Sequence, residues 1–396
     1  MKKIYLHGAK DQIARHSTIR DINKQIVLNY VRAKSPISRA EIARETSLQR
    51  STVSAIVDDL TIKGMIEEIG TGDSTGGRKP TLLRLRTGTP AVIGVDVTPR
   101  ETTIALADLT GNIMQREVFP TSSDLDYMND RILSKVTQLA VAHPDKGVEV
   151  GISIPGIADQ VAGRMLYIPY FQWSYWDIGQ KINAATGLPV VVDNDANAVA
   201  LAELWFGSDA IKKTRNFIVV MVAEGIGTGI IIDGQVYRGE SGAAGEFGHM
   251  FVGEYAPVTC SCGRRDCWEA HASEKALVHR YNANNGTNGG PINIDRLIGL
   301  AQNGEKQAVS VMKETAGYLG IGISNLIIGF SPQTIVVSGS IVRAWDVISD
   351  EIHELARRSI RHEIAVTNIV PSALGENPTI LGSISLVLSR KFASAN

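Results

Sequence analysis

The chain of 396 residues contains only three cysteines, too few for a disulfide framework. No apolar run reaches the roughly 20 residues that a membrane-spanning helix needs, and the stretch NFIVVMVAEGIGTGIII is interrupted by Glu224 and by several glycines. The first residues, MKKIYLHGAKDQIARH, are basic but lack the apolar core of a secretory signal. These absences disfavour a secreted or membrane protein and predict a soluble, cytoplasmic one.

Charge is distributed unevenly along the chain. Residues 1–90 contain 16 Lys and Arg against 9 Asp and Glu, a net charge of +7, and the remainder carries 24 against 32, a net charge of −8. A basic N-terminal module on an acidic body predicts contact with nucleic acid at one end, although small domains also carry surplus lysines. The composition, 44% hydrophobic and 20% charged, is that of a folded protein.

Residues 21–64 show the pattern of three helices. Apolar residues at helical spacing define the first, and Ser38 followed by Glu41 forms the Ser-x-x-Glu pattern of a capping box that begins the second. A third helix is expected over about Arg50–Lys63, with Gly64 as its end signal. Two short helices joined by a tight turn form a helix-turn-helix, which places the start of the second one in the major groove of DNA.

The residues expected to contact DNA lie at the start of that helix and on a following hairpin. The stretches MIEEIG and TLLRLR, separated by TGDSTGGRKP, predict a two-stranded wing. Basic side chains on a thin wing tip suit the narrow minor groove, although a solvated hairpin with two stray charges fits the same residues. The expected contacts are Arg50, Ser51, Thr52 and Ser54 in the major groove and Arg78 and Lys79 on the wing.

Residues 88–396 alternate strand-like and helix-like segments in two similar halves. Strands are expected around a turn in Gly94–Leu109, with a helix at Asp130–Ala142, and the second half begins with FIVVMVA, the turn EGIGTG and IIIDGQVY. This pattern predicts an α/β fold of two lobes with a cleft between them. We expect a winged helix-turn-helix domain over residues 1–87 and a two-lobed domain over 88–396. One lobe would comprise about 88–195 plus the C-terminal segment, and the other about 196–375.

All three cysteines lie within eight residues, as Cys260, Cys262 and Cys267, and His249 lies eleven residues upstream of the first. Three thiolates and one imidazole form a closed tetrahedral set for a structural zinc ion. The alternative is that the cysteines are small buried side chains or a reducible pair. Because the loop is polar and the chain has no other cysteine, the pattern favours zinc.

A second polar group, VDNDANAVALAE, falls where a buried strand ends and a helix begins. The carboxyl ends of strands are where α/β proteins place their ligand contacts. Carboxylates and amides there suit vicinal hydroxyls, and one carboxylate has the chemistry of a general base. Helix capping explains one such polar residue but not the four in Asp193–Asn197, so the cluster favours a ligand site.

The order of these motifs resembles the ROK family of repressors, open reading frames and sugar kinases. The resemblance rests on the winged helix-turn-helix, VDNDANAVALAE, GAAGEFGH and C-x-C-G-x-x-x-C-x-E, and it covers nearly the whole chain. It implies a branch of transcription regulators with a sugar-binding cleft between two actin-like lobes. It also implies that Asn194, Asp195, Glu246, His249 and Glu269 bind the sugar, that Asp195 occupies the position of the kinases' catalytic base, and that His249 contacts both sugar and metal.

The expected phosphate-binding turns depart from those of the family's kinases. Backbone N–H groups must come close to the phosphates of ATP, which glycines permit. Those kinases carry a Gly-Gly-Thr-type turn after the first strand's aspartate, whereas Asp96 is followed here by VTPR, and Pro99 has no N–H to donate. The second turn keeps its glycines, but Glu224 would repel phosphate, and Ser340 stands where a glycine is usual. These departures predict that the chain is not an enzyme.

The two modules together predict a repressor that a monosaccharide or sugar derivative releases from its operator, with activation as an open alternative. A homodimer, or a dimer of dimers, would present two recognition helices to an inverted repeat in double-stranded DNA. The rival hypotheses are an ATP-dependent sugar kinase with a DNA-binding domain and a repressor released by a transport-protein partner. The aromatic segment IPYFQWSYW is expected in the core, with stacking on a sugar ring as the alternative.

Overall fold

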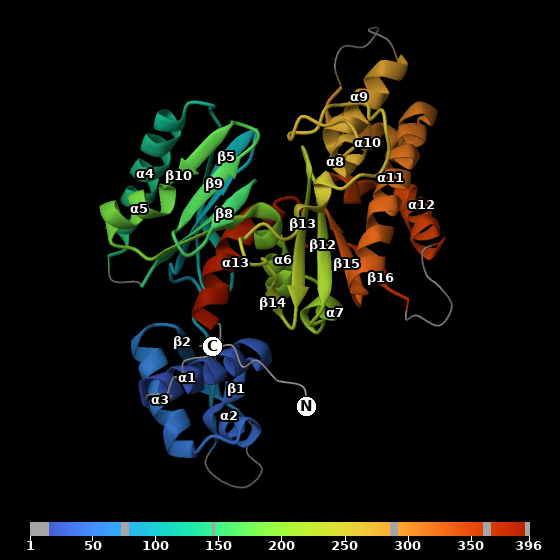
Figure 1. Ribbon diagram of the computed structural model, residues 1–396. Helices are drawn as coiled ribbons and strands as arrows, with labels where there is room; N and C mark the ends of the chain where they lie inside the picture. Colours follow the sequence, from blue (N-terminus) through green and yellow to red (C-terminus); the bar gives the residue numbers. More distant parts are fainter. Residues whose placement is uncertain (1–15, 73–78, 145–146, 286–291, 359–365, 393–396) are drawn as a thin grey trace, which may run out of the picture.

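The computed structural model describes residues 16–72, 79–144, 147–285, 292–358 and 366–392. Figure 1 shows a small N-terminal module below two α/β lobes, with the C-terminal helix α13 reaching toward the module. No helix in the described ranges combines the length and the apolar character needed to pass through a lipid bilayer.

The N-terminal module has the predicted helices and wing strands. It consists of α1 (His16–Lys34), β1 (Ile37–Ser38), α2 (Arg39–Thr46), α3 (Arg50–Ile62), β2 (Ile66–Thr71) and β3 (Thr81–Leu85), with the strands in the antiparallel order β1-β3-β2. The capping box is present, since Ser38 Oγ accepts a hydrogen bond from Glu41 N at 3.3 Å and the Glu41 carboxylate accepts one from Ser38 N at 2.8 Å. Gly64 follows α3 at φ +67°, a conformation that favours glycine. Arg78 lies outside the described residues.

The first lobe is built on a five-stranded sheet in the order β11-β7-β4-β5-β6. Its strands are β4 (Val92–Val97), β5 (Glu101–Ala107), β6 (Ile113–Pro120), β7 (Glu149–Ile154) and β11 (Val190–Asn194). Helices α4 (Leu125–Ala142) and α5 (Ile178–Thr186) pack against this sheet in one core cluster. A smaller sheet, β8 (Ile157–Asp159), β9 (Arg164–Ile168) and β10 (Trp173–Trp176), has no counterpart among the sequence-based expectations.

The second lobe is built on another five-stranded sheet, in the order β14-β13-β12-β15-β16. Its strands are β12 (Phe217–Val222), β13 (Ile226–Ile232), β14 (Gln235–Val236), β15 (Thr334–Ser338) and β16 (Asn368–Pro371). One face packs against a helical layer of α8 (Trp268–Ala272), α9 (Glu274–Asn285), α10 (Ile294–Gln302), α11 (Lys306–Phe330) and α12 (Trp345–Arg358). The other face packs against α6 (Asp195–Phe206), and a short helix, α7 (Asp209–Lys212), follows.

Two expected boundaries were wrong. Helix α4 begins at Leu125 rather than Asp130, because the Asp124 carboxylate caps it by accepting hydrogen bonds from the backbone N–H groups of residues 126 and 127. The turn EGIGTG is shorter than expected, because Ile226 already pairs with Val222 as the first residue of β13. Only residues 223–225 therefore form the turn between β12 and β13.

Helices α6 and α13 (Pro378–Phe392) form a layer between the two large sheets. Helix α13 packs on β4 and β7 of the first lobe, and α6 packs on β12 and β13 of the second. The two helices touch each other closely at Gly382, where an added Cβ would lie 2.9 Å from the backbone of Ala198. Both helices end beside the N-terminal module.

The N-terminal module is joined to the body at those two helix ends. The Arg32 guanidinium of α1 lies 3.9 Å from the ring centroid of Trp205 at the end of α6 and 5.8 Å from that of Phe392 at the end of α13. Asn29 Nδ2 donates a hydrogen bond of 2.8 Å to the Phe392 carbonyl. Apolar residues of α1, α3, β4 and α13 form one continuous core cluster across the junction.

Candidate ligand cleft, metal cluster and DNA-binding surface

A cleft of about 760 Å³ lies between the two lobes. The first lobe contributes the turn after β4 and the ends of β7 and β11. The second lobe contributes the β12–β13 turn, the segment around Glu246 and the start of α8. All five residues expected to bind a sugar, namely Asn194, Asp195, Glu246, His249 and Glu269, line this one cleft. It has two parts, a sugar side around these residues and a far side around Arg100, Glu224 and Ser340.

Asn194 serves as the N-cap of α6 as well as lining the cleft. Its Oδ1 accepts hydrogen bonds from Ala196 N at 2.9 Å and Asn197 N at 3.2 Å, and its Nδ2 donates one of 3.0 Å to the Gly156 carbonyl. Its Oδ1 already accepts two hydrogen bonds, the usual number for a carbonyl oxygen, but Nδ2 keeps a second N–H that can donate to a ligand. Capping and ligand binding are therefore compatible at this residue.

Asp195, the first residue of α6, carries a carboxyl whose proton is held unusually tightly. Burial, with the neighbouring carboxyls of Asp96 and Glu246, raises the pKa of Asp195 to about 7. Its Oδ1 accepts a hydrogen bond from Ala196 N at 2.9 Å. Burial also raises the pKa of Asp96 to about 6, an effect partly offset by hydroxyl bonds from Thr379 at 2.6 Å and Ser153 at 2.7 Å. Asp195, which lines the cleft, and the buried Asp96 near it therefore both have pKa values close to neutrality.

Asp193, next to these residues, connects the lobes through an ion pair that the sequence did not indicate. Its Oδ2 accepts hydrogen bonds from Nη2 of Arg238 at 2.8 Å and from Nε of the same side chain at 3.0 Å. Asp193 is only 2% exposed, and it also accepts hydrogen bonds from Gln160 and Asn197. Because Arg238 follows β14 of the second lobe, this pair holds the end of β11 against that lobe.

Glu269 is held in place by the cysteine loop. Its Oε1 accepts hydrogen bonds from Ser261 N at 3.1 Å and Ser261 Oγ at 3.0 Å, and Cys260 Sγ lies 3.3 Å from the same oxygen. Its Oε2 lies 3.3 Å from Ile226 N at the start of β13. The loop therefore sets the orientation of a carboxylate that faces the cleft.

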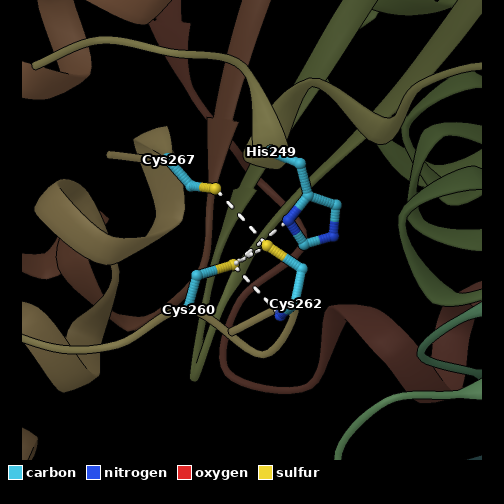
Figure 2. A group of neighbouring side chains, drawn as sticks. All are labelled: His249, Cys260, Cys262 and Cys267. Carbon is cyan, nitrogen blue, oxygen red and sulfur yellow. Dashed lines mark hydrogen bonds between the residues drawn. The ribbon is translucent and has the colours of Figure 1, made fainter. Parts of the chain in front are cut away.

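Figure 2 shows the four expected metal ligands converging on one point. The ligand atoms of His249, Cys260, Cys262 and Cys267 all lie within 4.8 Å of one another. Cys262 Sγ is 3.3 Å from Cys260 Sγ and 3.5 Å from Cys267 Sγ, close to the roughly 3.8 Å that separates sulfurs around a tetrahedral zinc. His249 Nδ1 is 3.1 Å from Cys260 Sγ, and its Nε2 is 3.5 Å from the Glu246 carboxylate. The cluster therefore fits a metal ion and links it to the cleft.

The far side of the cleft is crossed by a second interlobe ion pair. Arg100, in the turn after β4, contacts the carboxylate of Glu224 in the β12–β13 turn. These are the two turns that would approach the phosphates of a nucleotide. Glu274, which is 6% exposed, also lines this side. Two carboxylates, those of Glu224 and Glu274, therefore line this side of the cleft.

The expected DNA contacts other than Arg78 lie in the described part of the N-terminal module, and their exposure differs. Arg50 and Ser51 at the start of α3 are exposed, and Thr52 and Ser54 are half-buried. Lys79, at the edge of the wing, is exposed. Arg39, by contrast, pairs with Asp58 at 2.7 Å and Glu68 at 3.1 Å, so it stabilises the module.

Comparisons with known proteins agree with this architecture. Residues 92–390 match the family described as "ROK family", and residues 20–67 match "Winged helix-turn-helix DNA-binding". The xylose repressor of Bacillus subtilis (strain 168) is 32% identical over 382 residues, which cover 95% of this chain and 97% of that protein. A solved ROK family transcriptional regulator, a homolog of the E. coli MLC protein, is similar with a TM-score of 0.80 and 26% identity, covering 95% of this chain and 97% of its own. A glucokinase from Streptomyces griseus, solved with glucose and AMPPNP, is similar with a TM-score of 0.64 and 29% identity, covering 74% and 98% respectively.

Proposed function

Because the chain belongs to the ROK family and begins with a winged helix-turn-helix, we propose that it is a transcription repressor that a sugar releases from its operator DNA. The observation that carries this proposal is the course of α6. The helix begins at Asp195 in the cleft and ends near Trp205, whose ring lies against Arg32 of the DNA-binding module. A ligand that moves the start of a 12-residue helix also moves its end, about 18 Å away.

The sugar binds on the side of the cleft formed by Asn194, Asp195, Glu246, His249 and Glu269. Carboxylate and amide groups accept and donate hydrogen bonds to neighbouring hydroxyls, and the carboxylates are the strong acceptors. A zinc ion held by His249 and the three cysteines supports this side, because the loop that carries the cysteines also orients Glu269. When bound, zinc supplies structural cross-linking of the loop.

The far side of the cleft suits no nucleotide, so the protein is a sensor rather than a kinase. Pro99 donates no backbone hydrogen bond, and the Arg100–Glu224 ion pair already spans the two turns that would hold phosphates. A polyphosphate entering there would compete with Glu224 for Arg100 and would face the carboxylate itself. In this role Asp195 accepts a hydrogen bond from the sugar when ionised or donates one to the sugar when protonated, and it removes no proton from the sugar.

DNA is recognised by a homodimer or a dimer of dimers. Arg50, Ser51, Thr52 and Ser54 read the major groove, and Lys79 with Arg78 follows the wing into the minor groove. Two such modules related by a twofold axis require an operator with inverted half-sites. Sugar binding weakens DNA affinity only if the sugar prefers the conformation that binds DNA poorly, and DNA then weakens sugar affinity by the same factor.

Fluorescence anisotropy tests the proposal. The full chain is titrated onto a labelled copy of the DNA upstream of its own gene, at one fixed salt concentration, with and without D-xylose, D-glucose and N-acetyl-D-glucosamine. We expect at least one sugar to weaken DNA binding, and Asp195→Asn to lose that response while keeping DNA affinity. Unchanged DNA affinity with every sugar that binds would contradict the proposal.

An ATP-dependent sugar kinase is the second candidate. It is favoured by the pKa of about 7 at Asp195, which suits a general base at neutral pH. Its test is sugar-dependent release of ADP from ATP and magnesium, which Asp195→Asn would abolish. We expect no such release above the rate without sugar.

A further inference from the structure

The aromatic segment IPYFQWSYW joins β9 to β10 and is anchored in the first lobe. Phe171 stacks on Trp173 with a centroid distance of 4.5 Å, and Trp173 contacts Trp176 edge to face at 5.2 Å. The indole N–H of Trp173 donates to the Ser123 carbonyl at 3.0 Å, and that of Trp176 donates to Oδ1 of the buried Asn129 at 2.7 Å. These side chains lie in the core, as expected, and they hold the β9–β10 turn rigidly.

Two tyrosines of the segment do not lie in the core: Tyr175 is 66% exposed, and Tyr170 lines the cleft. Its hydroxyl reaches from the first lobe to the β12–β13 turn of the second. A Cβ added to Gly225 would lie 2.4 Å from Tyr170 Oη and 2.2 Å from Glu269 Oε2. Only a glycine at position 225 leaves room for the Tyr170 hydroxyl and the Glu269 carboxylate, so both groups lie against the backbone of that turn.

This position lies at the boundary between the two sides of the cleft. Gly225 follows Glu224, which pairs with Arg100 on the far side, and precedes Ile226, whose backbone N–H faces Glu269 on the sugar side. The Tyr170 hydroxyl therefore lies beside the residue at which the lining of the cleft changes from the far side to the sugar side.

The hydroxyl of Tyr170 is available to a ligand. It has no hydrogen-bond partner among the described residues. Burial, with the carboxyls of Glu269 and Asp195 nearby, raises the pKa of Tyr170, so the group stays protonated and can donate a hydrogen bond. The same carboxyls repel any anionic group placed beside the phenol.

We propose that Tyr170 contacts the ligand and determines its class, a free, uncharged monosaccharide. The phenol hydroxyl forms a hydrogen bond with one sugar hydroxyl, and the ring closes that end of the sugar side. A sugar extended there by a phosphate or a second ring meets the phenol and the surrounding carboxyls. The inference rests on the proposed sugar-binding function, because it assigns the residue that limits the ligand in that same site.

Isothermal titration calorimetry of the full chain tests this assignment. The ligands are D-xylose, D-glucose, N-acetyl-D-glucosamine, D-glucose 6-phosphate, xylobiose and maltose. The variants are Tyr170→Phe, Tyr170→Ala and, as a matched control, Tyr167→Phe, which alters an exposed tyrosine on β9 outside the cleft. Metal content and thermal unfolding show that each variant is folded, and Tyr170→Phe keeps the ring in place.

We expect the wild type to bind a free monosaccharide and to discriminate against the phosphate and the disaccharides. Loss of one hydrogen bond in Tyr170→Phe should weaken the preferred sugar about two- to tenfold. Tyr170→Ala should reduce the preference for the monosaccharide over its extended forms by about tenfold or more, since one ring then no longer closes the site. The control should match the wild type.

The outcomes separate the two proposals. A wild type that binds no sugar overturns the proposed function, and this inference with it. If the wild type binds a sugar and both Tyr170 variants bind it with the same affinity and the same preference as the wild type, the inference alone is overturned. Tighter wild-type binding of the phosphate or a disaccharide than of every monosaccharide also overturns it, while leaving a sugar-responsive protein.

Discussion

Glu203 lies on α6 between the cleft and the DNA-binding module, and replacing it should change how stability depends on pH. The side chain is 1% exposed, and neither of its carboxyl oxygens has a partner within hydrogen-bond geometry among the described residues. Burial raises the pKa of Glu203 from 4.5 to about 7, and the nearby Ser372 hydroxyl offsets only part of this shift. The folded chain therefore retains this proton at a pH where the unfolded chain has lost it.

The sign and size of the effect follow from this difference. Between about pH 4.5 and 7 the folded state binds more protons than the unfolded state, so the free energy of unfolding falls as the pH rises through that window. The full pKa shift corresponds to a contribution of about 3 kcal/mol to the free energy of unfolding. About 2.5 kcal/mol of this contribution is lost between pH 5 and pH 8. Glu203→Gln has no proton to lose there, and the cost of burying its amide is the same at both pH values.

Urea unfolding followed by tryptophan fluorescence measures this effect at pH 5 and pH 8. The free energy of unfolding of the wild type should fall by about 2.5 kcal/mol more than that of Glu203→Gln over this range. The control variant Glu240→Gln, which removes an exposed carboxylate, should show the same pH dependence as the wild type. Contributions from the metal loop are common to all three proteins and cancel in the comparison. Parallel pH profiles for wild type and Glu203→Gln would refute the reasoning.

Three further changes test the other modules. Arg50→Ala removes an exposed side chain that we propose to contact the major groove, and it should weaken DNA binding in the anisotropy assay by about 1–3 kcal/mol, with sugar affinity unchanged. Cys262→Ser removes one of the four side chains that we propose to bind zinc, so we expect a lower zinc content by elemental analysis and, because Glu269 loses its support, weaker sugar binding. Full sugar affinity in a variant without zinc would show that the cysteine loop does not support the sugar site. Trp205→Ala removes a cation–π contact of about 0.5–1 kcal/mol and should leave sugar and DNA affinities nearly intact while the sugar-dependent loss of DNA binding shrinks. An undiminished sugar response in that variant would exclude this contact from the coupling.

The features that the sequence predicted correctly are those with local causes. The capping box of Ser38 and Glu41 spans four residues and depends only on helix geometry. Cys260, Cys262 and Cys267 lie so close in the chain that one loop brings them together. The start of α4 was missed because its first turn, LDYM, shows little helical periodicity before the buried Met128.

The contacts that were missed join residues far apart in the chain. Arg238 and Asp193 are 45 residues apart, and Arg100 and Glu224 are 124 apart. Such pairs form only once the order of strands in two sheets is known, and nothing in the flanking residues encodes that order. The place of Tyr170 was left open between the core and a sugar site for a different reason, since an aromatic residue in such a segment has the same pattern whether it points into the core or into a cleft.

The close packing of α6 determines how a ligand in the cleft can affect the DNA-binding module. On one side, a Cβ added to Gly229 in β13 would lie 2.3 Å from the Ala196 carbonyl oxygen, and on the other side a Cβ added to Gly382 of α13 would lie 2.9 Å from the backbone of Ala198. With no space on either side, α6 cannot shift alone. A change in the angle between the lobes must therefore displace α6 together with α13, or slide α6 along one of these glycine contacts. Both helices end at the rings that hold Arg32. A change of lobe angle therefore reorients the surface on which α1 rests, and in a dimer the same rotation changes the separation of two recognition helices that must span one operator.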